Sequence, residues 1–197
     1  MQAYPYIQSL EIDTPRLLLK EVNEEHFGQL YTNYSDEEAK RFLGITTDEA
    51  LDTEKKKFYG GLTTFRTSVK FFMMREKKLG RVIGSCAFHA WFPMHSRTEI
   101  GYAMTDDTLK NKGYMSEALR YIIPFGFEHM GLNRIEAFIG QANIPSLSLI
   151  RKFGFTEEGT LRQHYYKDGD LQDSICFSLL KQEYDLLKLT PVFSHDN

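Results

Sequence analysis

The stretch from Glu99 to Leu119 has the residue types and spacing of an anion-binding turn. A predicted strand leads into a turn that contains Gly113, and Ser116 then opens a predicted helix. At a helix N-terminus the first backbone N–H groups have no partner within the helix, and the helix dipole makes this end positive. Lys110 and Lys112 add positive charge beside the turn. We therefore expect a phosphate site here, and a cofactor that carries a pyrophosphate would fit it.

The second informative stretch runs from Gln141 to Phe155. Asn143 can cap a helix, Pro145 suits its first turn, and Gly154 can adopt the left-handed conformation that ends it. Taken alone, this pattern predicts only a short helix with clear ends. Because the helix follows a second predicted strand, its N-terminus can face the same groove as the first turn.

The elements that must position these two stretches form a mixed α/β pattern without repeats. Helices are predicted at 24–33, 48–65, 116–130 and 145–153, with Gly60-Gly61 as a weak point in the second. Strands are predicted at 16–22, 70–75, 81–89, 97–104, 134–139, 158–166 and 171–180. Because no internal linker separates these elements, we expect one domain over residues 1–189 and a flexible tail over residues 190–197.

The composition is that of an ordinary globular protein: 42% of the 197 residues are hydrophobic and 14% are aromatic. A net charge of −3 argues against a nucleic-acid binder with a broad basic surface. No apolar run approaches the roughly 20 residues of a membrane helix, and no signal-peptide pattern is present, so we expect a cytoplasmic protein without membrane partners. Cys86 and Cys176 stand in apolar runs and are expected to be reduced. The histidines lack metal-ligand spacing, so no metal is expected.

Together, these stretches resemble the GNAT superfamily of N-acetyltransferases, specifically the RimJ/RimL-type branch that acetylates ribosomal-protein amino termini. The resemblance covers about Thr14 to Gln182. It implies an α/β GNAT fold, with a mixed, mostly antiparallel central sheet of about seven strands that is splayed at the cofactor site and flanked by helices. It also implies acetyl-CoA as the acetyl donor. The resemblance rests on Thr14-Pro15-Arg16-Leu17-Leu18-Leu19, Gly84, Glu99-Ile100-Gly101-Tyr102, Lys112-Gly113-Tyr114-Met115-Ser116-Glu117-Ala118, Asn143-Ile144-Pro145-Ser146 and Lys152-Phe153-Gly154-Phe155-Thr156-Glu157-Glu158-Gly159.

In this family the glycine-containing turn binds the pyrophosphate of acetyl-CoA, and the preceding strand pairs its backbone with the pantetheine arm. The resemblance therefore implies a set of cofactor-binding residues on the strand end, the turn and the second helix. These residues are Ala103, Met104, Thr105, Lys110, Asn111, Lys112, Gly113, Tyr114, Met115, Ser116, Asn143, Ser146 and Lys152.

Two positions depart from the family pattern. The turn is commonly Gln/Arg-x-x-Gly-x-Gly/Ala, and here its fixed positions are Thr108, Asn111 and Gly113. Asparagine tolerates the left-handed backbone better than most residues, so we expect Asn111 to keep the turn intact. Ile150 stands where many members have a tyrosine that protonates the leaving thiolate. Either the Ser146 hydroxyl serves the sulfur instead, or the thiolate leaves without dedicated help.

The acceptor amine must lose a proton before it attacks the thioester, and Glu99 is the first candidate for this base. The alternative is a structural carboxylate that pairs with Arg97 or Lys70. Gly101, two residues along the same strand face, is expected to leave room for the acceptor. Asp173 is the second candidate for contact with the amine. A backbone N–H near Ala103 or Met104 would stabilise the oxyanion, and direct attack needs no cysteine nucleophile.

We therefore expect an N-acetyltransferase that acts on a primary amine, with a protein N-terminal α-amine as the first choice. One alternative is an enzyme for small amines such as a polyamine, an amino acid or an aminoglycoside. The other is a catalytically inactive CoA-binding sensor, which the departures at Asn111 and Ile150 would suit. The sequence leaves open whether the protein is a monomer or a homodimer.

Overall fold

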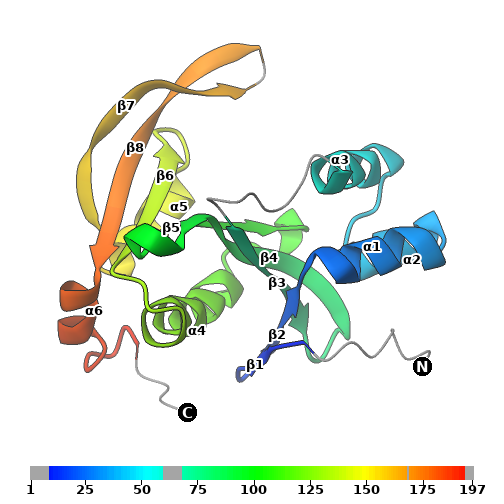
Figure 1. Ribbon diagram of the computed structural model, residues 1–197, viewed down its shortest axis with the longest axis horizontal. Helices are drawn as coiled ribbons and strands as arrows, with labels where there is room; N and C mark the ends of the chain where they lie inside the picture. Colours follow the sequence, from blue (N-terminus) through cyan, green and yellow to red (C-terminus); the bar gives the residue numbers. More distant parts are fainter. Residues whose placement is uncertain (1–8, 60–67, 168, 194–197) are drawn as a thin grey trace. The chain divides into compact units, whose positions relative to one another are not determined.

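The computed structural model describes residues 9–59, 68–167 and 169–193, and these contain one eight-stranded sheet in the order β1-β2-β3-β4-β5-β6-β8-β7 (Figure 1). All seven predicted strands are present. The additional strand is β1, whose three residues pair antiparallel with β2. The strands are β1 Glu11–Asp13, β2 Leu17–Val22, β3 Ser68–Glu76, β4 Arg81–Phe92, β5 Arg97–Met104, β6 Arg134–Gly140, β7 Thr156–Lys167 and β8 Asp170–Leu180.

The predicted helices are present as α1 Glu24–Asn33, α3 Asp48–Tyr59, α4 Tyr114–His129 and α5 Ile144–Lys152. The predicted continuation of α3 through Gly60-Gly61 lies outside the described residues. Two further helices, α2 Asp36–Leu43 and α6 Lys181–Leu187, were missed, and two single 3₁₀ turns, η1 Pro93–His95 and η2 Asp107–Leu109, flank β5. Within the described ranges, none of the helices is long and apolar enough to cross a membrane.

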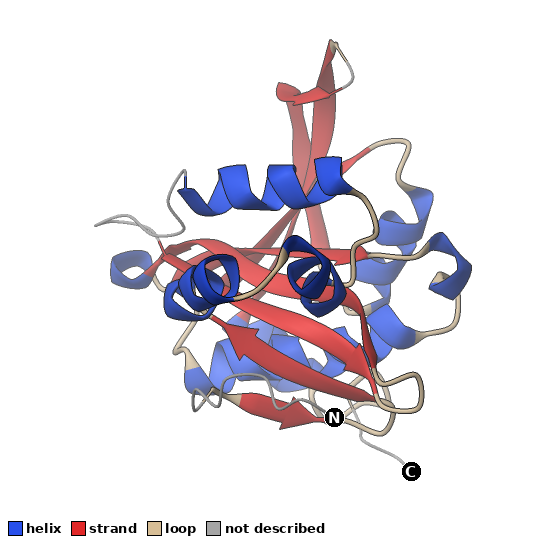
Figure 2. Ribbon diagram, turned by 90° about the vertical axis from the view of Figure 1, so that its right-hand side faces the viewer, coloured by secondary structure: helices blue, strands red, loops and turns tan. Residues whose placement is uncertain are grey.

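The chain forms two compact units. The first unit comprises Met1–Ala87 and Tyr102–Ala118, and the second comprises Phe88–Gly101 and Leu119–Asn197. In the first unit α1, α2 and α3 pack on one face of the strands (Figure 2), where they bury a shared apolar cluster. This burial stabilises helices whose own sequences are rich in charge. The cluster consists of Val22, Phe27, Leu30, Ala39, Leu43, Leu51 and Met73.

In the second unit β8 pairs antiparallel with both β6 and β7, and β7 and β8 form a long hairpin (Figure 1). Alternate residues of β6 are buried, which is the pattern of a strand with one face on a core. Tyr184 of α6 stacks on Phe127 at 4.8 Å. Phe193, within the predicted tail, is only 4% exposed and packs on Phe153 and Tyr184, while residues 194–197 lie outside the described part.

The pairing of β5 with β6 is parallel and short. It joins Arg97–Glu99 to Arg134–Glu136, although β5 continues to Met104 and β6 to Gly140. Within these two fully described strands, the parallel pairing therefore stops at Glu99. Beyond such a point the backbone groups of a strand are available to a ligand, which makes the end of the pairing a natural place for a site.

Candidate active site

The turn predicted to bind an anion lies in the first unit and follows η2. Asn111 and Gly113 both have left-handed backbones, with φ values of 60° and 78°. The expectation that Asn111 can take the place of a glycine is thus confirmed in its conformation. Residues 110–113 are exposed, and α4 begins directly after them at Tyr114. The turn therefore presents a helix N-terminus to solvent with its glycine-like geometry intact.

The start of this turn is fixed by hydrogen bonds that the Asp106 carboxylate accepts. Its Oδ1 accepts from the backbone N–H of Thr108 at 2.9 Å and from the Thr108 hydroxyl at 2.6 Å. Its Oδ2 binds the Arg81 guanidinium at 3.0 Å. The hydrogen bonds from Thr108 and Arg81 lower the pKa of Asp106 to about 2. Asp106 therefore caps the 3₁₀ turn η2, and Thr108, which stands where the family commonly has Gln or Arg, donates to this cap.

Arg16, which directly precedes β2, contacts this turn and was not among the site residues expected from the sequence. Its Nη1 donates to the Lys112 carbonyl at 2.9 Å, and its guanidinium lies 4.5 Å from the centre of the Tyr114 ring. A Cβ atom at Gly113 would meet Arg16 Nη2 at 3.4 Å. The Thr14-Pro15-Arg16 motif was part of the family resemblance, but only as the start of a strand. Arg16 thus adds a third cationic side chain beside this turn, after Lys110 and Lys112.

Arg16 is itself held by Glu117, a carboxylate in the first turn of α4 that is only 8% exposed. Glu117 accepts from Arg16 Nε at 2.5 Å, from the Arg16 backbone N–H at 2.7 Å and from the Thr14 hydroxyl at 2.6 Å. Although burial alone raises the pKa of Glu117, the hydrogen bonds from Thr14 and Arg16 outweigh it and hold the pKa below its usual value. This network fixes the end of β1 and the start of β2 to the N-terminus of α4.

We expect Glu117→Gln to lower the free energy of unfolding by about 2 kcal/mol at pH 7, because it weakens charge-assisted hydrogen bonds in a mostly buried place. Urea titrations across pH measure this. Since the folded-state pKa of Glu117 is lowered, its contribution is present above the ordinary value of 4.5 and is lost as the pH falls through the folded-state pKa. The difference between wild type and variant should therefore shrink in acid.

Glu157→Gln is the matched control, because its pair with Arg151 leaves both side chains about half exposed. We expect this exposed pair to contribute less than about 0.5 kcal/mol. Equal losses in the two variants would contradict a special role for the Glu117 network.

Glu99 lies in the second unit, on β5, with its side chain 15% exposed. Its Oε2 is 3.6 Å from His89 Nδ1. Burial and the negative charge of Glu136 raise the pKa of Glu99 to about 7, against a lowering by the hydrogen bond with the Tyr165 hydroxyl. A carboxyl group that changes its charge near neutral pH is well suited to accept a proton during a reaction.

The ion pairs near Glu99 differ from those expected if Glu99 were a structural carboxylate paired with Arg97 or Lys70. Arg97 binds Glu136 at 2.9 Å instead of Glu99, and Lys70 binds Glu21 at 2.7 Å. Glu136 also receives Arg134 at 2.7 Å. Because Arg97 and Arg134 bind Glu136, Glu99 experiences the negative charge of Glu136, and no arginine among the described residues forms an ion pair with Glu99.

The space at Gly101 is not the room for an acceptor that the sequence suggested. A Cβ atom at Gly101 would come within 2.5 Å of His89 Nε2, so the imidazole fills this position. Burial lowers the pKa of His89, which keeps the ring neutral near pH 7. His89 was passed over because it lacks metal-ligand spacing, yet it lies between Gly101 and Glu99. A neutral imidazole in this place can exchange a proton with the carboxyl group.

The second helix N-terminus is formed as predicted, also in the second unit. Asn143 Oδ1 accepts from the Ser146 backbone N–H at 3.3 Å, which confirms the cap of α5. Ile150 is 0% exposed, so its side chain belongs to the core. Ser146 is partly buried in the first turn, and Lys152 is the last residue of the helix.

Asp173, the second candidate for contact with the amine, has a hydrogen bond within the β7–β8 hairpin. Its Oδ1 accepts from the Gln163 backbone N–H at 2.8 Å. Gln163 has a left-handed backbone, with φ of 52°, and lies in the irregular stretch between Leu161 and Tyr165. Asp173 thus helps to fix the bulge from which Tyr165 reaches Glu99.

The predicted site residues therefore fall into two groups. Ala103, Met104, Thr105 and the turn from Lys110 to Ser116 belong to the first unit. Glu99, Asn143, Ser146 and Lys152 belong to the second. In the described ranges, no group of three or more His, Cys, Asp or Glu side chains is placed to hold a metal ion.

Comparison with known proteins finds a family match over most of this chain. The family described as "Acetyltransferase (GNAT) domain" matches residues 16–156. The N-acetyltransferase p20 of Bacillus licheniformis, whose role is uncharacterised, is 34% identical over 87% of this chain and 96% of its own length. YdaF of Bacillus subtilis, provisionally named a ribosomal N-acetyltransferase, is 31% identical over 54% of this chain and 57% of its own length.

Two further matches carry specific substrate names. The spermidine N(1)-acetyltransferase of Escherichia coli is 22% identical over 50% of this chain and 52% of its own length. Among solved structures, RimL, described as a ribosomal L7/L12 alpha-N-protein acetyltransferase, aligns with a TM-score of 0.65 at 21% identity, over 88% of this chain and 96% of that chain. At this identity the structural likeness establishes the fold.

Proposed function

Because the chain belongs to the GNAT family of N-acetyltransferases, we propose that it transfers the acetyl group of acetyl-CoA to the α-amine of a protein N-terminus. The family assigns the reaction class and implies acetyl-CoA as donor and an amine as acceptor. The choice of a protein N-terminus is supported by the relatives named for ribosomal proteins, YdaF and RimL. The observation that carries the catalytic part is Glu99, whose pKa is raised to about 7.

The turn is the proposed binding place of the acetyl-CoA pyrophosphate. Its left-handed residues Asn111 and Gly113 directly precede the N-terminus of α4, where the first backbone N–H groups lack partners within the helix, and Lys110 and Lys112 supply charge. Tyr114, Met115 and Ser116 provide the first N–H groups of the helix. The backbone of Ala103, Met104 and Thr105 would serve the pantetheine arm, as would Asn143. Lys152 remains a further proposed contact.

Acetyl-CoA supplies the activated thioester, and the protein must supply a neutral amine. A protein α-amine has an ordinary pKa of about 8 and is mostly protonated at pH 7. We assign Glu99 to remove its proton, directly or through water, and His89 to exchange that proton further. A backbone N–H near Ala103 or Met104 would stabilise the oxyanion. Cys86 is fully buried and its pKa is raised by burial, so it is a poor nucleophile and direct attack is favoured.

A catalytically inactive CoA-binding sensor is less well supported than an enzyme. One of its two motivations was Asn111, and that residue keeps the left-handed backbone of the family's turn. The other motivation was Ile150, which stands where many members have a tyrosine and cannot protonate the leaving thiolate. A CoA thiol is acidic enough to leave without such a donor, so neither departure argues strongly against turnover.

Release of the CoA thiol, measured with purified protein, acetyl-CoA and separate amine panels, tests the function. The panels are peptides with free N-termini, the same peptides with blocked N-termini, spermidine, free amino acids and an aminoglycoside. We expect release with the free peptides alone. Release only with a small amine would replace the proposed substrate, and binding of acetyl-CoA without release in any panel would favour the sensor.

For the second helix we expect Ser146→Ala to lower turnover at saturating substrates while the affinity for acetyl-CoA stays the same, if its hydroxyl assists the leaving thiolate. Asn143→Ala should instead raise the acetyl-CoA concentration needed for half-maximal rate, and should cost about 1 kcal/mol of stability through the lost cap. Steady-state kinetics and urea titrations separate the two effects.

Ser148→Ala is the control, because Ser148 lies on the same helix and is exposed. Full turnover in the Ser146→Ala protein would show that the thiolate leaves without this hydroxyl. An Asn143→Ala protein that loses stability but binds acetyl-CoA normally would restrict Asn143 to its capping role.

A further inference from the structure

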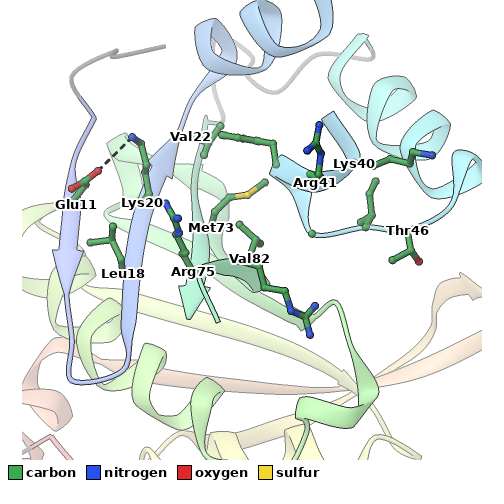
Figure 3. A pocket seen from close by; sticks show the side chains of 15 residues that line it. Glu11, Leu18, Lys20, Val22, Lys40, Arg41, Thr46, Met73, Arg75 and Val82 are labelled. Carbon is green, nitrogen blue, oxygen red and sulfur yellow. Dashed lines mark ion pairs between the residues drawn. The ribbon is translucent and has the colours of Figure 1, made fainter. Parts of the chain in front are cut away.

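A cavity of about 410 Å³ opens in the first unit, between the strands β2, β3 and β4 and the segment that links α2 to α3 (Figure 3). This volume is in the range of pockets that bind small molecules. The lining residues all lie between Glu11 and Val82. None of them belongs to the turn, to Glu99 or to α5, so the cavity is separate from the residues proposed for acetyl transfer.

The strand side of the cavity is largely apolar. Leu18, Lys20 and Val22 are alternate residues of β2 and project from the same face of the sheet. In the register of β2 with β3, Met73 lies opposite Lys20 and Arg75 lies opposite Leu18, and Figure 3 shows them side by side. Lys20 thus lies between the apolar Leu18 and Val22 on this face, and Arg75 lies at its end beside Leu18.

The opposite side of the cavity is closed by the turn after α2. Gly44 has a left-handed backbone with φ of 72°, and a Cβ atom there would meet the Val82 carbonyl at 2.8 Å. The chain can cross so close to β4 only because this residue is a glycine. Phe42 and Ile45 flank Gly44 and add apolar surface to the cavity.

The charges around the cavity are mostly positive. Five lining residues are cationic and Glu11 is the acidic one among the lining residues described. Three of the cations have carboxylate partners: Lys20 with Glu11 at 3.4 Å, Lys40 with Asp48 at 2.7 Å, and Arg81 with Asp106 at 3.0 Å.

The two remaining cations are Arg41 and Arg75, which come from different sides of the cavity, Arg41 from α2 and Arg75 from β3 (Figure 3). Arg41 Nε donates to the Glu37 carbonyl, and its positive charge acts on the nearby Glu38 carboxylate. Within the described ranges, the Arg75 guanidinium forms no ion pair. An apolar cavity with an uncompensated guanidinium group at its edge is complementary to a molecule that is apolar at one end and anionic at the other.

We propose that this cavity binds an amphipathic carboxylate, such as a medium-chain fatty acid. The alkyl chain lies against Leu18, Phe42 and Ile45, lining residues that keep partly exposed side chains, and the carboxylate pairs with Arg75. Guanidinium groups suit this role, because their planar donors match the two oxygens of a carboxylate. The proposal is independent of the acetyl acceptor.

Calorimetric titration of the full chain with decanoate tests the proposal. We expect saturable binding with a dissociation constant on the order of 100 µM, as is typical for a ligand of this size. The probes 1-decanol and acetate keep the alkyl chain or the carboxylate alone, and each should bind at least about 10-fold more weakly. If 1-decanol binds as tightly as decanoate, the Arg75 guanidinium does not hold the carboxylate, and the proposed binding mode is wrong.

Three variants locate the binding. Arg75→Gln changes one exposed side chain and should weaken decanoate binding about 10-fold. Leu18→Trp should abolish binding by filling the cavity, with thermal melting as the check that the variant folds. Lys56→Gln removes one exposed charge from α3 outside the cavity and should leave the affinity unchanged. Non-saturable binding, or an unchanged affinity in Arg75→Gln, would refute the site.

Discussion

Replacement of Glu99 by glutamine is expected to lower turnover about 100-fold or more near pH 7, with little change in the affinity for acetyl-CoA. Glutamine keeps the size of the side chain but cannot accept a proton from the amine. The expectation depends on the position of Glu99, which lies 3.6 Å from His89 and has its pKa raised to about 7. Steady-state kinetics with saturating acetyl-CoA and a peptide acceptor measure the change in turnover.

The pH dependence carries the sharper information. The wild-type rate should rise with pH through an inflection near 7, because the base must be ionised to act. In Glu99→Gln this inflection should disappear, and the deficit should shrink above about pH 8, where more of the α-amine is already neutral.

The stability of Glu99→Gln relative to wild type should also depend on pH, and it should rise as the pH rises. The folded-state pKa of Glu99 is raised from 4.5 to about 7, so the protonated form is favoured by folding. This contribution is fully present below the unfolded value and is lost as the pH rises through 7. We therefore expect Glu99→Gln to be more stable relative to wild type at pH 8 than at pH 4, which also shows that its lost turnover is not caused by unfolding.

Glu157→Gln, an exposed carboxylate of the second unit, is the control for the loss of one charge. If Glu99→Gln turns over at the wild-type rate with an unchanged pH profile, the carboxylate is structural. Asp173→Asn would then become the variant to test.

Replacement of Gly113 by valine is expected to weaken acetyl-CoA binding by roughly 10- to 100-fold. The φ of 78° at this residue is costly for a β-branched side chain, and the new Cβ atom would also meet Arg16 Nη2 at 3.4 Å. The contact with the flexible end of Arg16 is minor, whereas the strained backbone disturbs the N–H groups that we assign to the pyrophosphate. Calorimetry with acetyl-CoA measures the loss.

Gly131→Val is the matched control. Gly131 has a similar left-handed backbone, with φ of 66°, and a Cβ atom there meets nothing within 4 Å. Both variants should lose stability, but only Gly113→Val should lose affinity. An unchanged affinity in Gly113→Val would remove the turn from the acetyl-CoA site.

The sequence could predict those elements whose signals are local. Asn23 caps α1 at the expected residue, and β5 has the predicted bounds. The helix α2 also carries a local signal, the capping box of Ser35 and Glu38 with the left-handed stop at Gly44, which was overlooked. In contrast, β1 has only three residues, and its pairing with β2 is a tertiary contact that no short pattern reveals.

In the candidate site, too, residues with local sequence signals could be predicted, whereas residues placed by tertiary contacts could not. Asn111 could be assigned a left-handed backbone from its residue type, and Glu99 could be chosen from its place on the strand. The interaction of Arg16 with Glu117 joins residues 101 positions apart, so the chain alone could not reveal it. His89 also needed the structure, because only the approach of β4 to β5 places its ring against Gly101 and Glu99.

Tandem mass spectrometry of the reaction product tests the proposed function most directly. The purified protein is incubated with acetyl-CoA and peptides that have both a free N-terminus and an internal lysine, with spermidine as a separate acceptor. We predict one acetyl group on the α-amine for each thiol released, and a strongly reduced yield with Glu99→Gln. Acetylation confined to the lysine side chain or to spermidine, or no transfer at all, would contradict the proposal.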